Sequence, residues 1–414
     1  MTTPSALFVD LYELTMAQLY YERGMTGEAI FELTVRQPPK DWDYLVAAGL
    51  ERALDFLESL QFTEDDLEFI DTLPQFNRGF IDRLRHLRFT GDVWAPPEGT
   101  IVYPDEPLVQ VIAPLPEAQI VETAIINQVA YPTLVASKAA RAVDAAAGRP
   151  VIEFGGRRAH GSEAAIEASR ATYIAGFDAT SSVEAGRRYA IPTTGTMAHS
   201  FVLAEGDEAN AFDAFVSRYP GTTLLVDTFD TQQGVINAIK TAKQHGPGSV
   251  GAIRIDSGDF RAEAWQARIM LDTAGLSDVR IVASGGLDEY QIAELVAANA
   301  PIDVFACGTS IVAPPDAATL DSAYKMVEYE GRPVAKRSPG KPSIGHRKQV
   351  WRLPDHDLIA RFEDRPTDVD PVLQQVMSSG QRTSDGHDSL SRIRARAAGP
   401  GGPRRVEIDP SLLR

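Results

Sequence analysis

From residue 150 to residue 308 the sequence alternates short apolar runs with longer segments whose apolar residues recur at helical spacing. The apolar runs cover residues 150–154, 172–177, 190–195, 222–227, 250–256, 279–284 and 302–308. Strands that alternate with helices are typical of βα units arranged around a parallel sheet. Because six or seven such units follow one another, the pattern predicts an α/β barrel, closed or incomplete, with a doubly wound open sheet as the alternative.

The segments on either side of these units have a different pattern. Before them we expect an amphipathic helix at 5–25, a strand at 29–39, a helix at 47–60, short strands within 89–115, and a long helical stretch at 117–146 interrupted near Pro132. After them we expect strand-like sequence at 325–338 and 347–353 and a flexible, basic tail at 392–405. The chain is therefore predicted to divide into one α/β domain, residues 1–140 with 322–414, and a barrel domain, residues 141–321.

Composition limits the kinds of partner that this chain can have. A formal net charge of −17 over 414 residues argues against broad electrostatic binding to nucleic acid or to anionic membranes. The sequence has no apolar run of membrane-spanning length and no basic, then apolar, N-terminal signal, so we expect a cytoplasmic protein. The single cysteine, Cys307, excludes an intrachain disulfide and a multi-cysteine zinc site. An anionic small substrate would need a local concentration of cations.

Polar side chains follow nearly every predicted strand. In a parallel barrel the carboxyl ends of the strands meet at one face, so these side chains are expected to lie together. Asp227 and Asp256 end two consecutive strands, where carboxylates can hold Mg²⁺ or ribose hydroxyls. Arg157 and Arg254 are candidates for the required cations. Helix capping and surface ion pairing are the alternatives, and capping is favoured for some of the residues, such as Asp230.

Two late strands end in turns of small residues, at Gly285–Gly286 and at Gly308–Thr309. Such turns let backbone N–H groups approach a phosphate. Because the two turns follow successive strands of the predicted barrel, they indicate a phosphate site.

His199 stands between an apolar run and an acidic stretch, at the end of a predicted strand. A histidine in this position is either part of the core or a nucleophile, and the local sequence alone favours the core.

Seven motifs together resemble those of the nicotinate phosphoribosyltransferase family, in the family's order and up to about Arg352. They are DLYELTMAQ from Asp10, EFGGRRAHG from Glu153, GTMAHS from Gly195, VDTFDT from Val226, RIDSGD from Arg254, CGTS from Cys307 and VAKRSPGK from Val334. The resemblance implies an irregular, incomplete TIM-like α/β barrel beside an α/β N-terminal domain that C-terminal residues complete. It also implies a homodimer with shared sites that joins nicotinate to phosphoribosyl pyrophosphate, with ATP hydrolysis and Mg²⁺.

The resemblance also implies a role for individual residues. His199 would be phosphorylated by ATP, since a neutral imidazole can attack a γ-phosphoryl group, and Asp227 and Asp256 would hold ribose hydroxyls and Mg²⁺ on the diphosphate. The implied substrate-binding residues are Tyr12 of the partner subunit, Phe154, Arg157, Ser181, Arg254 and Ser257. The 5′-phosphate would bind to Gly285, Gly286, Gly308 and Thr309. Nucleotide phosphates would bind to Lys336, Arg337 and Lys341, for which a basic surface loop is the alternative.

Rival functions fit less well. In nicotinamide phosphoribosyltransferases the position of Ser181 is expected to be a carboxylate, so its hydroxyl favours the acid substrate. Quinolinate phosphoribosyltransferases have no phosphorylated histidine, and an aldolase would need a lysine at a strand end. A non-catalytic phosphate-binding or nucleotide-binding barrel protein would have no reason to gather charged groups at consecutive strand ends.

Overall fold

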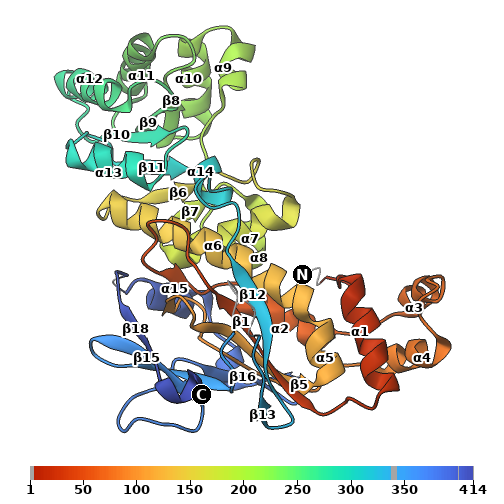
Figure 1. The fold of residues 1–414 in the computed structure, drawn as a ribbon. Helices are drawn as coiled ribbons and strands as arrows, with labels where there is room; N and C mark the ends of the chain where they lie inside the picture. Colours follow the sequence, from red (N-terminus) through yellow and green to blue (C-terminus); the bar gives the residue numbers. More distant parts are fainter. Residues whose placement is uncertain (1–3, 337–342, 400, 414) are drawn as a thin grey trace. The chain divides into compact units, whose positions relative to one another are not determined.

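The computed structural model describes residues 4–336, 343–399 and 401–413. The chain divides into two compact units (Figure 1). The terminal unit comprises Met1–Ser137 and Asp316–Arg414, and the barrel unit comprises Lys138–Pro315.

The barrel unit is built on a six-stranded parallel sheet in the order β7-β6-β11-β10-β9-β8. The strands are β6 (Val151–Glu153), β7 (Ala179–Thr180), β8 (Thr222–Leu225), β9 (Val250–Ile255), β10 (Arg280–Ser284) and β11 (Val304–Cys307). Their side chains are largely buried, as expected for parallel strands that helices cover on the outside. Because β7 and β8 remain as separate edges, the sheet does not close, and the prediction of an incomplete α/β barrel is confirmed.

Helices connect these strands (Figure 1). They are α7 (Ser162–Ala175), α8 (Val183–Tyr189), α9 (His199–Glu205), α10 (Glu208–Arg218), α11 (Thr231–His245), α12 (Phe260–Thr273), α13 (Glu289–Ala297) and α14 (Thr309–Val312). Asp230, Asp259 and Asp288 each accept a backbone N–H from the first turn of α11, α12 and α13. These three aspartates are therefore helix caps.

Two of the seven predicted strands are wrong. Residues 172–175 of the run at 172–177 form the last turn of α7, which is followed by Gly176 with a φ of 120°. The run at 190–195 forms only an isolated bridge, between Thr180 and Thr193. Pro192 within that run has no N–H to donate to a neighbouring strand, which explains why the segment does not extend the sheet.

The terminal unit contains a seven-stranded sheet in the order β13-β12-β1-β5-β3-β16-β17. Its strands are β1 (Glu28–Val35), β3 (Asp92–Ala95), β5 (Pro107–Pro114), β12 (Ser322–Tyr329), β13 (Arg332–Pro333), β16 (Gln374–Ser378) and β17 (Gln381–Arg382). β12 pairs with β1, and β16 pairs with β3, so C-terminal strands complete the N-terminal sheet as predicted. Two smaller sheets pair β2 (Leu45–Val46) with β4 (Ile101–Val102), and β14 (Lys348–Arg352) with β15 (His356–Arg361) and β18 (Arg405–Ile408).

The terminal unit's helices pack around a large apolar core. They are α1 (Leu11–Glu22), α2 (Leu50–Ser59), α3 (Glu64–Asp71), α4 (Arg78–His86), α5 (Leu115–Ile120), α6 (Glu122–Ala146), which continues into the barrel unit, and α15 (Leu390–Ala397). Two short 3-10 helices span Ser384–Gly386 and Pro410–Leu413. Among the described residues, no helix combines the length and the apolar character needed to cross a membrane.

Three expectations for the terminal segments are corrected. The long helical stretch does not break at Pro132, which lies inside α6; it breaks at Val121, between α5 and α6. The tail predicted at 392–405 is not flexible throughout, because most of α15 lies within it and β18 begins at its last residue. The predicted amphipathic helix is α1, but it exposes Leu11, Tyr12 and Leu19 and buries Glu13.

Candidate active site

The carboxyl ends of β6, β9, β10 and β11 surround a pocket of about 160 Å³ in the barrel unit. Eight of the predicted site residues line it: Phe154, Arg157, Arg254, Asp256, Gly285, Gly286, Gly308 and Thr309. Arg158, Ser284 and Ala306 complete the lining. The geometry therefore brings residues from four separate strand ends to one opening.

Arg254 lies on β9 and is only 8% exposed. Its Nε donates to Ser284 Oγ at 2.9 Å, its Nη1 donates to Thr196 Oγ1, and its Nη2 donates to Asp256 Oδ1 at 2.9 Å. A guanidinium carries five N–H groups, so these three contacts fix its plane and leave one N–H on each terminal nitrogen. The ring of Phe154 lies 5.7 Å from the guanidinium carbon. A rigid two-pronged donor beside an aromatic ring suits a flat carboxylate-bearing ligand.

Asp256 remains a carboxylate despite its partial burial. Burial raises its pKa, but the hydrogen bond from Ser284 and the charge and hydrogen bond of Arg254 outweigh that effect, and the pKa lies below its ordinary value. A charged carboxylate at this position can hold a metal ion or accept hydrogen bonds from hydroxyls.

Asp227 follows β8 and supports the end of β9. Its Oδ2 accepts the backbone N–H of Asp256 at 2.9 Å and the hydroxyl of Ser257 at 2.7 Å. Its Oδ1 is buried and has no hydrogen-bond partner among the described residues. A buried carboxylate oxygen without a donor is costly, so this atom fits a ligand hydroxyl or a hydrated cation. Within the described ranges, no group of three or more His, Cys, Asp or Glu side chains forms a ready-made metal cage. Mg²⁺ needs none, because it is usually held by one or two carboxylates and substrate phosphates.

His199 is not part of the core. It begins α9 rather than ending a strand, and its side chain is 41% exposed. Nδ1 lies 3.1 Å from Thr228 Oγ1, and Nε2 lies 3.9 Å from Asp256 Oδ2. The imidazole is thus held by one nitrogen while the other faces the Asp256 carboxylate.

The two glycine turns have different reasons for their glycines. Gly285 has a φ of 103°, and a Cβ there would lie 2.1 Å from the carbonyl oxygen of Asp256. Only glycine allows β10 to approach the end of β9 so closely. At Gly308 a Cβ would lie 3.2 Å from the carbonyl oxygen of Phe154, a tight contact.

Three of the remaining predicted residues, Tyr12, Ser181 and Lys336, are not among the residues that line the pocket. Ser181 is exposed and does not line the pocket, but it directly follows β7, whose Thr180 pairs with Glu153 of β6. Tyr12 and Lys336 belong to the terminal unit, where both are exposed. Partial burial of its hydroxyl raises the pKa of the Tyr12 phenol, and Glu122, which accepts its hydrogen bond, raises the pKa further. Arg337 and Lys341 lie outside the described residues.

Three hydroxyls at the site were missed by sequence reasoning: Thr196, Thr228 and Ser284, the partners of Arg254 and His199. Each lies within or at the end of a segment that the sequence marks as polar after an apolar run. Nothing in those segments says which hydroxyl reaches which neighbour.

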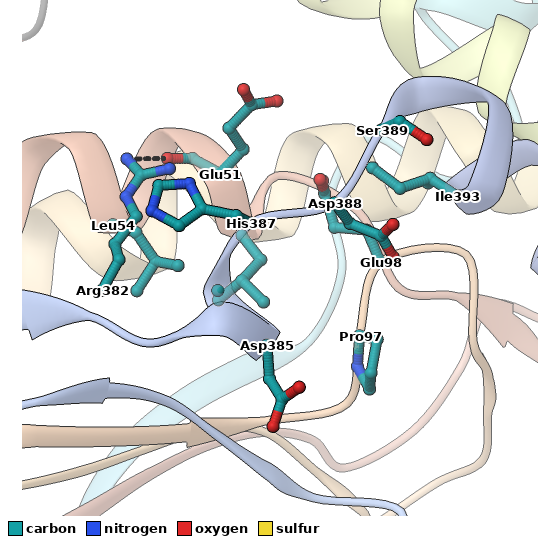
Figure 2. Close-up of a pocket in the computed structure, with 12 residues that line it drawn as sticks. Glu51, Leu54, Pro97, Glu98, Arg382, Asp385, His387, Asp388, Ser389 and Ile393 are labelled. Carbon is teal, nitrogen blue, oxygen red and sulfur yellow. Dashed lines mark hydrogen bonds between the residues drawn. The ribbon is translucent and has the colours of Figure 1, made fainter.

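A larger pocket, of about 240 Å³, lies in the terminal unit and contains none of the predicted site residues (Figure 2). It forms where residues 382–393 pass α2. Arg382 donates to the carbonyl of Glu51 and to Glu58, and Asp388 pairs with Arg396. These groups fasten the C-terminal segment to the unit.

The open barrel and its pocket of arginines, carboxylates and glycine turns define the class of α/β-barrel enzymes with polar residues gathered at the strand ends. Residues 7–130 match the N-terminal domain of nicotinate phosphoribosyltransferase. A nicotinate phosphoribosyltransferase of Mycobacterium tuberculosis is 50% identical over 91% of this chain and 82% of its own length. One of Bacillus subtilis is 40% identical over 88% of this chain and 77% of its own length. The crystal structure of human nicotinic acid phosphoribosyltransferase superposes with a TM-score of 0.82 and 26% identity, over 98% of both chains.

The chain belongs to the nicotinate phosphoribosyltransferase family, as the sequence motifs predicted. Its relatives do not favour the nicotinamide-specific or the non-catalytic alternative.

Proposed function

We propose that this chain joins nicotinate to phosphoribosyl pyrophosphate in the barrel pocket and couples the reaction to ATP hydrolysis through a phosphorylated His199. The ring nitrogen of nicotinate forms a bond to the anomeric carbon of the ribose. The bond from that carbon to the diphosphate breaks, and pyrophosphate leaves with the bonding electrons. The products are nicotinate mononucleotide and pyrophosphate.

The observation that carries this proposal is the fixed guanidinium of Arg254 beside Phe154 and the glycine turns. Its two remaining N–H groups would bind the nicotinate carboxylate, and the Phe154 ring would stack on the pyridine ring. The turns at Gly285–Gly286 and Gly308–Thr309 would bind the 5′-phosphate through backbone N–H groups. A ligand held at both ends in this way has its reacting atoms aligned, which is the main contribution an enzyme makes to a reaction with a good leaving group.

The carboxylates and arginines of the site would stabilise the charge of the diphosphate and the phosphate, the carboxylates through Mg²⁺ and the arginines directly. Asp227, through its unpartnered oxygen, and Asp256 would hold ribose hydroxyls and the Mg²⁺ that accompanies the diphosphate. When bound, Mg²⁺ neutralises the charge that develops on the leaving group. Arg157, which lines the pocket and is exposed, would contact the phosphate groups.

His199 would accept the γ-phosphoryl group of ATP. The P–N bond forms as the bond to ADP breaks, and water later releases phosphate from the histidine. The contact of Nδ1 with Thr228 holds the imidazole ring. The other nitrogen, Nε2, faces the Asp256 carboxylate, which accepts a hydrogen bond from Arg254. A neutral imidazole is a competent nucleophile toward a phosphoryl group when cations offset the oxygen charges.

Further parts of the proposal come from the family. The enzyme would be a cytoplasmic homodimer in the salvage of pyridine nucleotides, with Tyr12 of the partner subunit closing the pyridine site. Ser181 would favour an anionic over an amide substrate. Lys336, Arg337 and Lys341 would contact nucleotide phosphates.

Labelling with ATP that carries radioactive γ-phosphate tests the phosphohistidine. We expect acid-labile, base-stable label on the wild-type chain and none on His199→Asn, with the unlabelled variant still forming product slowly without ATP. Label of the same stability on His199→Asn, or full ATP stimulation of that variant, would contradict the assignment.

A further inference from the structure

Glu153, the last residue of β6, has a buried carboxylate whose partners are three neutral donors. The residue is 0% exposed. The backbone N–H of Gly155 donates to its Oε1, and the hydroxyls of Thr180 and Ser169 donate to its Oε2 at 2.6 and 3.1 Å. A buried charge is tolerated when hydrogen bonds replace its hydration, and a carboxylate is the side chain that accepts several bonds while donating none.

Two of these donors belong to different segments, a turn that carries residues of the pocket lining and the end of the neighbouring strand β7. Gly155 lies in the turn that carries Phe154 and Arg157, both of which line the pocket. Thr180 ends β7 and precedes Ser181. The turn after β7 is tied to Glu153 again through the main chain, because the N–H of Ser181 donates to the carbonyl of Glu153 at 2.9 Å. The Thr180 hydroxyl also accepts the N–H of Ser182 at 3.0 Å, which fixes the turn locally.

The turn at Gly155 has little room to adjust. A Cβ on Gly155 would lie 2.4 Å from a methyl group of Val312 and 3.0 Å from Glu153 Oε1. The N–H of Phe154 donates to the carbonyl of Cys307 at 2.7 Å, which ties the same turn to β11. The aromatic ring of Phe154 is therefore placed by the backbone that Glu153 holds.

We propose that Glu153 is a positioning residue for nicotinate: by bonding the turn of Gly155 and the hydroxyl of Thr180 at once, its carboxylate sets the spacing between Phe154 and Ser181. This inference rests on the proposed function, since it takes Phe154 as one face of the pyridine site and Ser181 as its selective edge. In the part of the chain that the structure describes, the phosphate turns after β10 and β11 donate no hydrogen bond to the Glu153 carboxylate, whose donors are Gly155, Ser169 and Thr180. Loss of the carboxylate should therefore weaken recognition of the pyridine more than recognition of the phosphoribosyl group.

Steady-state kinetics of Glu153→Gln test the proposal. An amide of the same shape can accept from only one side, and its NH₂ would face a donor, so the two turns lose their common anchor. We expect the KM for nicotinate to rise about tenfold or more, on the scale known for misplaced binding groups. The KM for phosphoribosyl pyrophosphate should rise less, because Arg157 lies on this turn but the two glycine turns follow β10 and β11. The preference for nicotinate over nicotinamide should fall.

Glu167→Gln is the matched control. Glu167 lies on α7, is 7% exposed, and accepts the hydroxyl of Tyr189 at 2.7 Å. Its substitution should lower Tm as Glu153→Gln does, without changing either KM. Equal loss of Tm in the two variants, with the KM for nicotinate unchanged in both, would overturn the proposal.

Thr180→Val is a second variant that tests the same proposal if Glu153→Gln does not fold. It removes the bond from Thr180 to the same carboxylate and the acceptor of the Ser182 N–H, while the main-chain bond from Ser181 to Glu153 stays in place. A smaller rise in the KM for nicotinate is therefore expected, and an unchanged KM would again overturn the proposal. A wild-type enzyme that makes no nicotinate mononucleotide would instead overturn the proposed function on which this inference rests.

Discussion

Arg254 and Asp256 stand two residues apart at the end of β9, and Nη2 of the arginine donates to Oδ1 of the aspartate across 2.9 Å. Alternate residues of a strand point to the same side, so this spacing places a cation and an anion together in the pocket. Ser284 of the neighbouring strand β10 bonds to both side chains. The three groups therefore fix one another, and the folded barrel holds a prearranged guanidinium before any ligand arrives.

Arg254→Lys should separate charge from geometry. A lysine keeps the positive charge but cannot bond Ser284, Thr196 and Asp256 while presenting a fork to a carboxylate. We expect the KM for nicotinate to rise about 10- to 100-fold, because the variant loses one charge-assisted hydrogen-bonded pair with the carboxylate. The KM for nicotinamide, which has no carboxylate, should change little. Arg268→Lys on α12 is the control, since Arg268 bonds the carbonyls of Val279 and Leu276 and does not line the pocket. Equal losses for the acid and the amide would contradict the role.

Gly285→Ala should damage both fold and site. Its Cβ would lie 2.1 Å from the carbonyl oxygen of Asp256, so β9 or β10 must move. Gly275→Ala is the control, because its φ of 78° is also left-handed but the space around it is open. That variant should lose only about 1–2 kcal/mol from its backbone conformation. Thermal unfolding and the KM for phosphoribosyl pyrophosphate distinguish the two variants. Gly285→Ala should lower Tm more than Gly275→Ala does, and only Gly285→Ala should raise the KM.

Much of the site, but not its internal bonding, can be predicted from the sequence. Arg254, Asp256 and the glycine turns follow clear apolar runs, so the alternation of strands and helices is enough to bring them together. The bonds of Ser284 to Arg254 and of Thr228 to His199 depend on which strands are neighbours and on where α9 begins, which no local pattern contains. For the same reason Glu153 looks like any polar residue at the end of a strand.

The local pattern of apolar and polar residues also gave wrong predictions of secondary structure and burial at particular residues. Residues 172–175 are apolar enough for a buried strand, yet they end α7, because a short apolar run fits a buried helix equally well. Pro132 lies inside α6, where the hydroxyls of Thr133 and Ser137 accept backbone N–H groups of the segment that contains β2. Glu13 is buried while apolar residues of α1 are exposed, so packing against α5 and α6 overrides the periodicity.

Glu13 should make stability depend on pH. Burial raises its pKa to about 8, although hydrogen bonds from Thr123 lower it in part. A carboxyl group with a raised pKa binds its proton more tightly in the folded state, so its contribution is complete below the unfolded pKa of about 4.3 and is lost as the pH rises through about 8. We expect Tm to fall between pH 5 and pH 8 by several degrees, and Glu13→Gln to reduce that slope. Glu22→Gln, at the exposed end of α1, should leave it unchanged. A slope that Glu13→Gln does not alter would refute this assignment.

Asp227→Asn should weaken the binding of the magnesium complex of phosphoribosyl pyrophosphate. The amide can still accept the N–H of Asp256 through one atom, but it removes the negative charge beside the unpartnered oxygen. We expect kcat/KM to fall about 100-fold or more, as for other lost electrostatic groups, and the Mg²⁺ concentration for half-maximal rate to rise. Asp230→Asn in the same loop keeps a good helix cap and should change neither quantity.

The most direct test offers the purified chain phosphoribosyl pyrophosphate, Mg²⁺ and one of three acceptors, nicotinate, nicotinamide or quinolinate, with and without ATP, and separates the products by chromatography. The account predicts nicotinate mononucleotide as the main product, formed faster or to a greater extent with ATP. Efficient use of nicotinamide or quinolinate in place of nicotinate, or no mononucleotide from any of the three, would contradict it.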